Sequence, residues 1–360
     1  MTRLGYSLRE AIALEGPMTV ERYMALCLAH YYATRDPLGV AGDFTTAPEI
    51  SQIFGELVGL WAMEVWNAMG RPARLHLVEL GPGRGTLMAD MLRTARILPD
   101  FLAALRVHLV ETSPTLRARQ QGMLAQSGPE IAWHGDMAEL PAGPMILVAN
   151  EFFDALPVRQ FVATERGWCE RLVGLAGDRL VFGLASAPEH QQRAARPAGA
   201  FLERQDASIC LTATIAGRLA REGGAALIID YGYWGPATAD TLQALRHHQP
   251  VDPLSDPGEA DLTTHVDFAQ IAAAGLAAGA RLHGLDTQAN FLHALGIATR
   301  AARLKAAASS EQAKAIEEAV ARLTDTGERG MGALFKVLAL THPGLDAVPG
   351  LHARPHPPQR

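Results

Sequence analysis

The sequence has few cysteines, no long apolar run and no long basic run, and each absence excludes a class of protein. Its three cysteines, Cys27, Cys169 and Cys210, are far apart and odd in number, which argues against a disulfide framework or a zinc site and favours a reducing compartment. We expect all three to be buried thiols without a chemical role. No apolar run approaches the roughly 18 residues of a membrane-spanning helix, and the net charge of −6 does not indicate a nucleic-acid-binding surface.

The N-terminal residues carry no visible targeting signal. Residues 1–10 lack both the apolar core of a secretory signal and the Arg- and Ser-rich composition of a transit peptide. At 360 residues, of which 48% are hydrophobic, the chain is long enough for one large domain with insertions or for two domains. We therefore expect a soluble, cytoplasmic protein.

A glycine-rich turn lies between a predicted strand and a predicted helix. An apolar run that contains Glu79 ends at residue 80, and residues 87–97 repeat apolar side chains with a helical period. A ligand can lie against the backbone where no Cβ intrudes, and glycine tolerates the positive φ angles of a tight turn. The pattern predicts a nucleoside-bearing cofactor, and a ligand-free turn is the alternative. The three glycines are Gly81, Gly83 and Gly85.

The glycine spacing separates two kinds of cofactor. A dinucleotide fingerprint places its third glycine three positions after the second, and that position is Thr86 here. The observed form, from Glu79 through Pro82 to Gly85, resembles motif I of class I S-adenosylmethionine (SAM) methyltransferases. Such a turn passes the methionine part of the cofactor close to the backbone, and an acid such as Glu79 lies near its ammonium group.

Polar residues follow three later predicted strands, at the sheet edge where open α/β folds bind ligands. The strand at 105–111 ends at Glu111, a position typical of the carboxylate that binds ribose hydroxyls. The strand near 131 precedes Asp136, which can accept a hydrogen bond from the adenine amino group. The predicted cofactor residues at these strand ends are Glu111 with Thr112, Asp136 with Met137, which can pack on the adenine ring, and Asn150, which we assign to the methionine end.

The linker at residues 42–49 precedes the cofactor-binding part of the chain. Thr45 or Thr46 with Glu49 can form a capping box for the next helix, or the linker can fold over the site as a lid that carries Asp43. The two interpretations are compatible.

Five ordered motifs together resemble the MidA family of class I SAM methyltransferases. This family groups the mitochondrial complex I assembly methyltransferases with their bacterial relatives, and the resemblance covers about residues 5–341. Five motifs in order are more specific than the glycine turn alone. They occupy residues 42–51, 78–85, 150–157, 261–268 and 331–337.

The resemblance and the order of predicted elements imply an α/β fold of the class I SAM methyltransferase type. We expect a Rossmann-like seven-stranded sheet with an antiparallel last strand, a helical N-terminal cap and an antiparallel β insertion. The predicted division is a cap and lid at 1–70, a SAM-binding domain at 71–341 with the insertion at about 158–187, and a disordered tail at 342–360.

The resemblance also implies an activity. It implies SAM as the cofactor, a protein substrate, and symmetric dimethylation of an arginine on a subunit of respiratory complex I, as ascribed to the mitochondrial members. Two other classes remain open: a methyltransferase with a different small-molecule or protein acceptor, and a non-catalytic assembly factor. A NAD-dependent oxidoreductase is disfavoured by Thr86 at the third-glycine position.

An arginine acceptor needs acids at the site, because a guanidinium has a pKa above about 12 and a delocalised lone pair. We expect Glu151 and Asp154, after the fourth strand, to hold it, with Asp43 as a further candidate. The alternative is that the two acids after the strand cap a helix or pair with Arg159. His265 is either a candidate site residue or a surface residue at the start of a helix that Thr264 and Asp267 cap.

Overall fold

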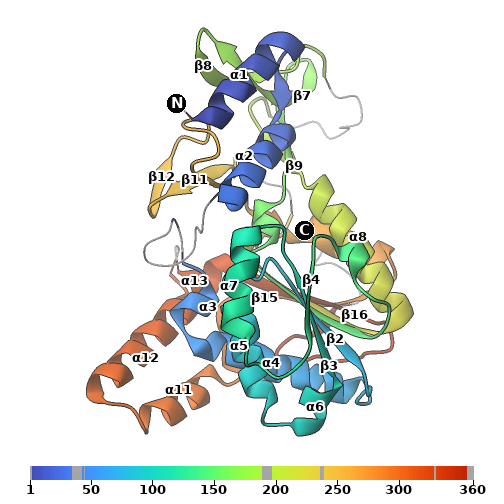
Figure 1. The fold of residues 1–360 in the computed structure, drawn as a ribbon. Helices are drawn as coiled ribbons and strands as arrows, with labels where there is room; N and C mark the ends of the chain where they lie inside the picture. Colours follow the sequence, from blue (N-terminus) through green and yellow to red (C-terminus); the bar gives the residue numbers. More distant parts are fainter. Residues whose placement is uncertain are drawn as a thin grey trace. The chain divides into compact units, whose positions relative to one another are not determined.

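The computed structural model of the protein describes residues 2–34, 43, 45–188, 197–235, 239–327 and 330–354. The chain forms two compact units, and each consists of three separate segments. In Figure 1 the segments of one unit therefore have colours that lie far apart on the sequence bar. No helix of the described residues is long and apolar enough to span a membrane. Unit 1 comprises Met1–Phe44, Asp154–Cys210 and Tyr233–Gln270, and unit 2 comprises Thr45–Phe153, Leu211–Gly232 and Ile271–Arg360.

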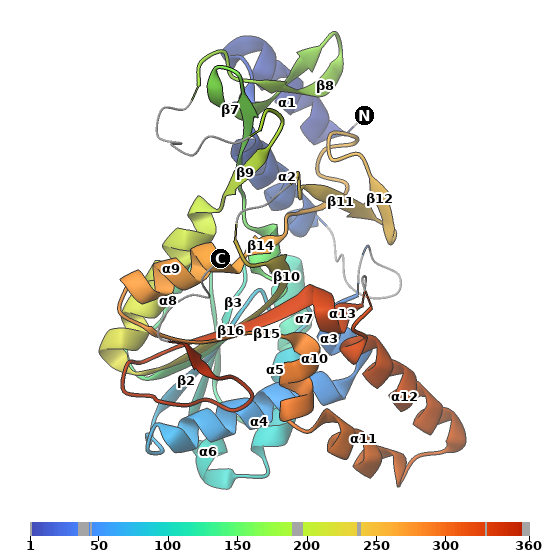
Figure 2. The same cartoon turned by 180° about the vertical axis from the view of Figure 1, so that it is seen from behind.

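Unit 2 is built on a mixed sheet with the strand order β17-β15-β16-β10-β5-β2-β3-β4. Neighbours from β10 to β4 are parallel, whereas β16 is antiparallel to both β10 and β15. Figure 2 shows β16, in red, beside β15. The predicted late antiparallel strand and the class I methyltransferase type of sheet are thus confirmed. The strands are β2 (Leu75–Leu80), β3 (Leu105–Val110), β4 (Ile131–His134), β5 (Met145–Asn150), β10 (Gly224–Tyr233), β15 (Arg281–Thr287), β16 (Phe335–Thr341) and β17 (Ala353–Arg354).

Helix α4 (Gln52–Ala68) is the main buried helix of unit 2. Most of its side chains are apolar and buried, as expected for a helix with little contact with solvent, and it packs against α5 (Thr86–Ala95). The two backbones approach closely, since a Cβ at Gly55 would lie 2.5 Å from the Cβ of Asp90. Further helices are α3 (Ala47–Ile50), α6 (Pro99–Ala104), α7 (Pro114–Leu124), α8 (Asp206–Glu222), α9 (Phe268–Ala277), α10 (Gln288–Ala294), α11 (Ile297–Lys305), α12 (Ser310–Thr324) and α13 (Met331–Leu334), with 3-10 turns η1 (Met137–Glu139) and η2 (Phe153–Ala155).

Three histidines on neighbouring strands of this sheet form a row. Nδ1 of His76 lies 2.9 Å from Nε2 of His108, and Nδ1 of His108 lies 2.9 Å from Nε2 of His134. Burial lowers the pKa of all three, and that of His108 falls to about 4. The row is therefore neutral at pH 7.

The described residues of unit 1 form two antiparallel sheets, with helices α1 and α2. Strands β6, β7 and β8 form the predicted insertion, and β7 also pairs with β1. The helices pack on this sheet through buried residues such as Tyr23 and Met24. The elements are α1 (Arg3–Glu15), β1 (Met18–Thr19), α2 (Val20–Thr34), β6 (Arg159–Thr164), β7 (Gly167–Ala176), β8 (Arg179–Leu184), β9 (Phe201–Arg204), β11 (Gln243–Arg246), β12 (Gln249–Val251), β13 (Asp261–Thr263) and β14 (Val266–Asp267).

The structure differs from several local predictions. The alanine-rich pattern of residues 299–324 predicts one long helix, but the structure has two, because Ser309 forms a capping box with Gln312 and starts α12 anew. The capping box of Thr264 with Asp267 is wrong: the carboxylate of Asp267 itself accepts the Ala269 N–H, at 2.9 Å.

The exposure of one cysteine and the order of the C-terminal segment also differ from expectation. Cys210 is exposed, whereas the other two cysteines are buried as predicted. Residues 342–354, which we expected to be disordered, contribute β17 and are anchored by buried Leu345, Val348 and Leu351. Residues 355–360 of the expected tail lie outside the described residues. The predicted cap at 1–70 includes helix α4, which belongs to unit 2. The division into 1–70, 71–341 and 342–360 stays a prediction.

Candidate active site

The glycine turn connects β2 to α5. Gly81, Gly83 and Gly85 have φ angles of 58°, 54° and 85°, which L side chains rarely adopt. A Cβ at Gly81 would also lie 2.7 Å from Cδ2 of Phe152. Pro82 is buried within the turn. The turn therefore presents bare backbone at the carboxyl edge of the sheet, as the sequence predicts.

Two buried polar atoms lie near this turn without a partner among the described residues. Glu79 is 4% exposed and its Oε2 accepts no hydrogen bond there, and neither does Oδ1 of Asn150. The two residues lie near the ends of neighbouring parallel strands, paired at Leu80 and Ala149. Burial and the charge of Glu111 raise the pKa of Glu79 to about 8. A ligand with an ammonium group and a hydrogen-bond donor would satisfy both oxygens, which is the chemistry of a methionine moiety.

Glu111 follows β3 and has a fixed carboxylate. Its Oε1 accepts the Ser113 N–H at 2.8 Å, and its Oε2 accepts from Nε2 of Gln120 at 3.2 Å. Burial raises its pKa, and these hydrogen bonds oppose the rise. Thr112 beside it is exposed. The acid at the end of the second parallel strand is thus placed where a ribose carboxylate is expected.

The predicted adenine residues follow β4. Asp136 is exposed and caps η1, because its Oδ1 accepts the Ala138 N–H at 2.7 Å. Met137 is buried. The carboxylate of Asp136 is therefore accessible to solvent, whereas the apolar side chain of Met137 is not.

A sharp bend after β5 carries Glu151. The residue has a φ angle of 51°, unusual for a side chain with a Cβ. Asp230, at the sheet edge on β10, holds the bend: its Oδ2 accepts the N–H groups of Phe152 and Phe153, at 3.1 and 2.9 Å. The sequence shows an acid ending the fifth strand, but not that it would bind backbone 77 residues away in the chain.

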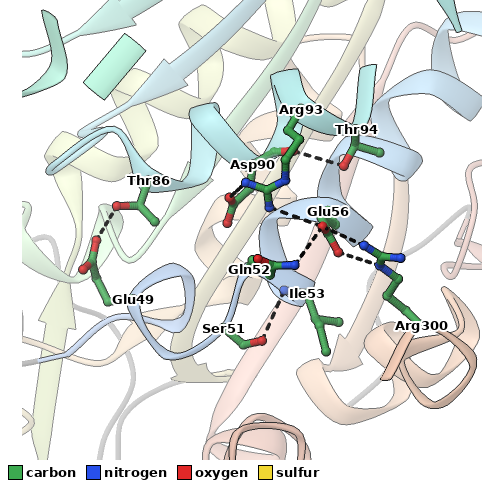
Figure 3. Close-up of polar contacts among 10 residues, drawn as sticks. All are labelled: Glu49, Ser51, Gln52, Ile53, Glu56, Thr86, Asp90, Arg93, Thr94 and Arg300. Carbon is green, nitrogen blue, oxygen red and sulfur yellow. Dashed lines mark hydrogen bonds and ion pairs between the residues drawn. The ribbon is translucent and has the colours of Figure 1, made fainter. Parts of the chain in front are cut away.

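Helix α3 bridges the bend and the glycine turn. The Ala47 N–H donates to Oε1 of Glu151 at 2.9 Å, and Oγ1 of Thr86 donates to Oε1 of Glu49 at 2.5 Å; Figure 3 shows the second contact. The capping-box interpretation is wrong, since Thr46 makes no side-chain cap bond. Of the predicted lid, residues 42 and 44 lie outside the described residues, and its movement stays a prediction.

The other candidate catalytic residues belong to unit 1. The carboxylate of Asp43 is buried and accepts from the Tyr31 hydroxyl at 2.6 Å and from the His247 N–H at 2.7 Å. Asp154 is buried, and burial lowers the pKa of His265. Glu151 and the predicted cofactor residues belong to unit 2.

An ion-pair network around the buried carboxylate of Glu56 connects the helices near the glycine turn. Glu56 of α4 is 5% exposed and accepts two hydrogen bonds from Arg300 of α11, at 2.7 and 3.0 Å. Arg93 of α5 donates to it at 3.2 Å and Gln52 at 3.3 Å. Figure 3 shows both arginines directed at Glu56. The network joins three helices and therefore stabilises the position of α5, which begins at the turn.

Comparisons with known proteins agree with this geometry. Residues 57–286 match a family model described as "Putative S-adenosyl-L-methionine-dependent methyltransferase". The mitochondrial protein arginine methyltransferase NDUFAF7 of Mus musculus is 40% identical over 323 residues, covering 79% of this chain and 72% of that protein. The Drosophila melanogaster NDUFAF7 homolog is 36% identical, covering 94% and 84%. A crystal structure of a COG1565 superfamily member from Burkholderia thailandensis, bound to S-adenosyl-homocysteine, has a TM-score of 0.85 and 31% identity, covering 98% and 96%.

These relatives correct one expectation. The prediction of a cytoplasmic protein is wrong, because the curated relatives are mitochondrial proteins. The cofactor prediction is confirmed by the family model and by the bound S-adenosyl-homocysteine of the structural relative. The chain therefore belongs to this family of SAM-dependent methyltransferases.

Proposed function

We propose that the chain methylates an arginine side chain of a protein. The names of the relatives at 36–40% identity support an arginine acceptor. The observation that carries the proposal is the fixed carboxylate of Glu151, on a bend beside the glycine turn and directly after Asn150. Bound SAM supplies the electrophilic methyl group.

The proposed chemistry follows from the guanidinium. Its positive charge is delocalised, and it matches a carboxylate through paired N–H···O bonds. A carboxylate on one side holds the group and concentrates charge on the nitrogens that are not methylated. We assign this role to Glu151 and Asp154, and keep Asp43 and His265 as further candidates for contact with the acceptor.

The proposed cofactor contacts use the carboxyl edge of unit 2. Glu79 and Asn150 would hold the ammonium end, because each has a buried oxygen without a partner among the described residues. The turn from Gly81 to Gly85 would pass along the methionine part. The remaining contacts are assigned to Glu111 and Thr112 for the ribose, and to Asp136 and Met137 for the adenine.

The acceptor is proposed to be a protein with an arginine at its surface. Within that class, we propose a subunit of respiratory complex I and symmetric dimethylation, as the family resemblance implies. Incubating the purified protein with radiolabelled SAM and lysate from cells that lack it would label the acceptor. Mass spectrometry of the labelled band then identifies the modified residue. A methylated lysine, or a labelled small molecule with no labelled protein, would refute the arginine assignment.

The role of Glu151 is tested by Glu151→Gln. We expect the methylation rate constant to fall by about a hundredfold, the size typical of removing one group that acts in the transition state, while the affinity for S-adenosyl-homocysteine changes little. Glu64→Gln, at an exposed position on α4, is the matched control and should keep full activity. A Glu151→Gln variant with full methylation would show that this carboxylate does not hold the acceptor.

A further inference from the structure

Gln120 on α7 is fully buried and joins three parts of the cofactor edge. Its exposed fraction is 0%. Its amide lies 2.9 Å from Nε1 of Trp133, 2.8 Å from the carbonyl oxygen of Gly83 and 3.2 Å from Oε2 of Glu111. A Cβ at Gly85 would lie 3.5 Å from its Cγ. The glycine turn therefore packs on this side chain and is also hydrogen-bonded to it.

The partners fix the orientation of the amide. An indole N–H only donates, so the atom that faces Trp133 is the amide oxygen. The Gly83 carbonyl and an ionised Glu111 only accept, so the amide NH₂ faces both and gives one N–H to each. A flipped amide would place donor against donor and acceptor against acceptor, leaving buried groups unsatisfied.

We propose that Gln120 is a positioning residue for SAM: it fixes the separation between the glycine turn and Glu111 and keeps the Glu111 carboxylate ionised in one orientation. Gln120 acts through these two partners rather than by touching the cofactor. The inference rests on the proposed role of Glu111 as the ribose ligand. It is independent of which acceptor is methylated.

Charged groups around this amide decide how it responds to substitution. Glu111 faces it from the end of β3, and Glu79 on β2 interacts electrostatically with Glu111. Arg117, on the same helix as Gln120, donates from Nε to the Glu111 carbonyl at 2.6 Å, and Arg84 follows Gly83 in the turn. Because two acceptors lie within 3.2 Å of the amide nitrogen, a carboxylate at this position would be repelled, whereas a protonated carboxyl would still donate one hydrogen bond.

Gln120→Glu tests the inference through pH. At pH 6 the introduced carboxyl, buried between acceptors, is expected to stay protonated, and the affinity for S-adenosyl-homocysteine should be within about threefold of the unsubstituted protein. At pH 8.5 it should ionise, and the affinity should fall by about thirtyfold or more relative to the unsubstituted protein at that pH. Gln120→Met should lose about tenfold in affinity at both pH values, because it removes the hydrogen bonds to buried Glu111 and to half-buried Gly83 and Trp133.

The adjacent Gln121 supplies a matched control. It is exposed on the same helix, so Gln121→Glu should bind S-adenosyl-homocysteine like the unsubstituted protein at both pH values. Titration calorimetry measures all affinities, and circular dichroism of each unliganded variant checks folding. An affinity ratio for Gln120→Glu that is the same at pH 6 and 8.5, or normal binding by Gln120→Met, would overturn the inference.

The variant Glu111→Gln tests the proposed role of Glu111 as the ribose ligand separately from the role of Gln120. If Glu111 binds the ribose, Glu111→Gln should weaken S-adenosyl-homocysteine binding. Normal binding by Glu111→Gln would refute the ribose assignment and, with it, the inference. Weakened binding by Glu111→Gln together with a pH-independent ratio for Gln120→Glu would refute the role of Gln120 alone.

Discussion

Cofactor binding should depend on pH through Glu79. The pKa of this carboxyl is raised to about 8, first by burial and second by Glu111. At neutral pH most unliganded molecules therefore hold a proton on Glu79. An ammonium group beside it favours the ionised form, so binding should release that proton, and affinity should rise with pH up to about 8.

The magnitude follows from the ionised fraction. With a pKa of about 8, roughly a tenth of the carboxyls are ionised at pH 7.0 and about 0.3% at pH 5.5, so affinity should fall about thirtyfold across this interval. The ligand's own α-amino group stays protonated throughout this interval, because even a peptide's terminal α-amino group has a pKa of about 7.7–8.0. Titration calorimetry with S-adenosyl-homocysteine in buffers of different ionisation enthalpy should detect release of about one proton at pH 6.

Two variants decide the source of the pH dependence. Glu79→Gln should bind with an affinity that hardly changes between pH 5.5 and 7.0 and should release no proton. Glu111→Gln should bind more weakly and keep a pH dependence, displaced to lower pH because the charge of Glu111 no longer raises the pKa of Glu79. A flat affinity in the unsubstituted protein, or the same slope in Glu79→Gln, would refute the assignment of Glu79 to the ammonium group.

The same pKa predicts how the unliganded protein responds to pH. The folded-state pKa lies above the ordinary value of 4.5, so the stability that neutral Glu79 contributes is complete below pH 4.5 and is lost as pH rises through 8. The loss reaches about 5 kcal/mol at most, from 1.36 kcal/mol per pKa unit. Urea unfolding at pH 6 and pH 9 should show about 3 kcal/mol of this loss, because only the interval from pH 6 to the pKa of about 8 lies between the two measurements. Glu79→Gln should remove it.

Three further predictions concern the scaffold. Gly81→Ala should weaken S-adenosyl-homocysteine binding at least tenfold, because alanine at a φ angle of 58° is strained and its Cβ would clash with the ring of Phe152. Gly122→Ala, with open space around it, is the control. Neutral His108, with a pKa of about 4, contributes stability that is complete above pH 6.5 and is lost as pH falls through 4. His108→Gln should therefore reduce the acid-induced fall in unfolding free energy by about 3 kcal/mol. Arg300→Ala should lower the unfolding free energy by about 2 kcal/mol in urea titrations, since buried Glu56 loses two charged hydrogen bonds; an unchanged midpoint would contradict this.

The sequence predicts the cofactor edge well, because the signals are local. The glycine turn follows directly from residues 81–85, and Glu111 and Asn150 stand at the ends of apolar runs. In a parallel sheet, the carboxyl ends of all strands lie at the same edge. A strand assignment is therefore enough to bring these residues together, and the structure confirms the parallel strands that carry them.

The residues that hold this edge in place could not be found in the same way. Gln120 lies inside an ordinary helical pattern, and its partners Gly83 and Trp133 are 37 and 13 residues away. Asp230 binds backbone of the Glu151 bend from another strand. Such roles depend on distances between side chains and distant backbone, which neither periodicity nor spacing encodes. The break before α12 is not visible in the sequence pattern, because alanine-rich sequence continues the helical period across it.

The interior position of β16 in the sheet has a consequence for synthesis of the protein. This strand, residues 335–341, occupies the place between β10 and β15, so a nascent chain on the ribosome has made β10 more than a hundred residues before its neighbour exists. During that interval Leu227, Ile228 and Ile229 form part of an uncovered strand edge, a template for pairing with other chains. Chaperones that shield exposed strands during translation should therefore raise the yield of this enzyme more than additives that stabilise the finished fold.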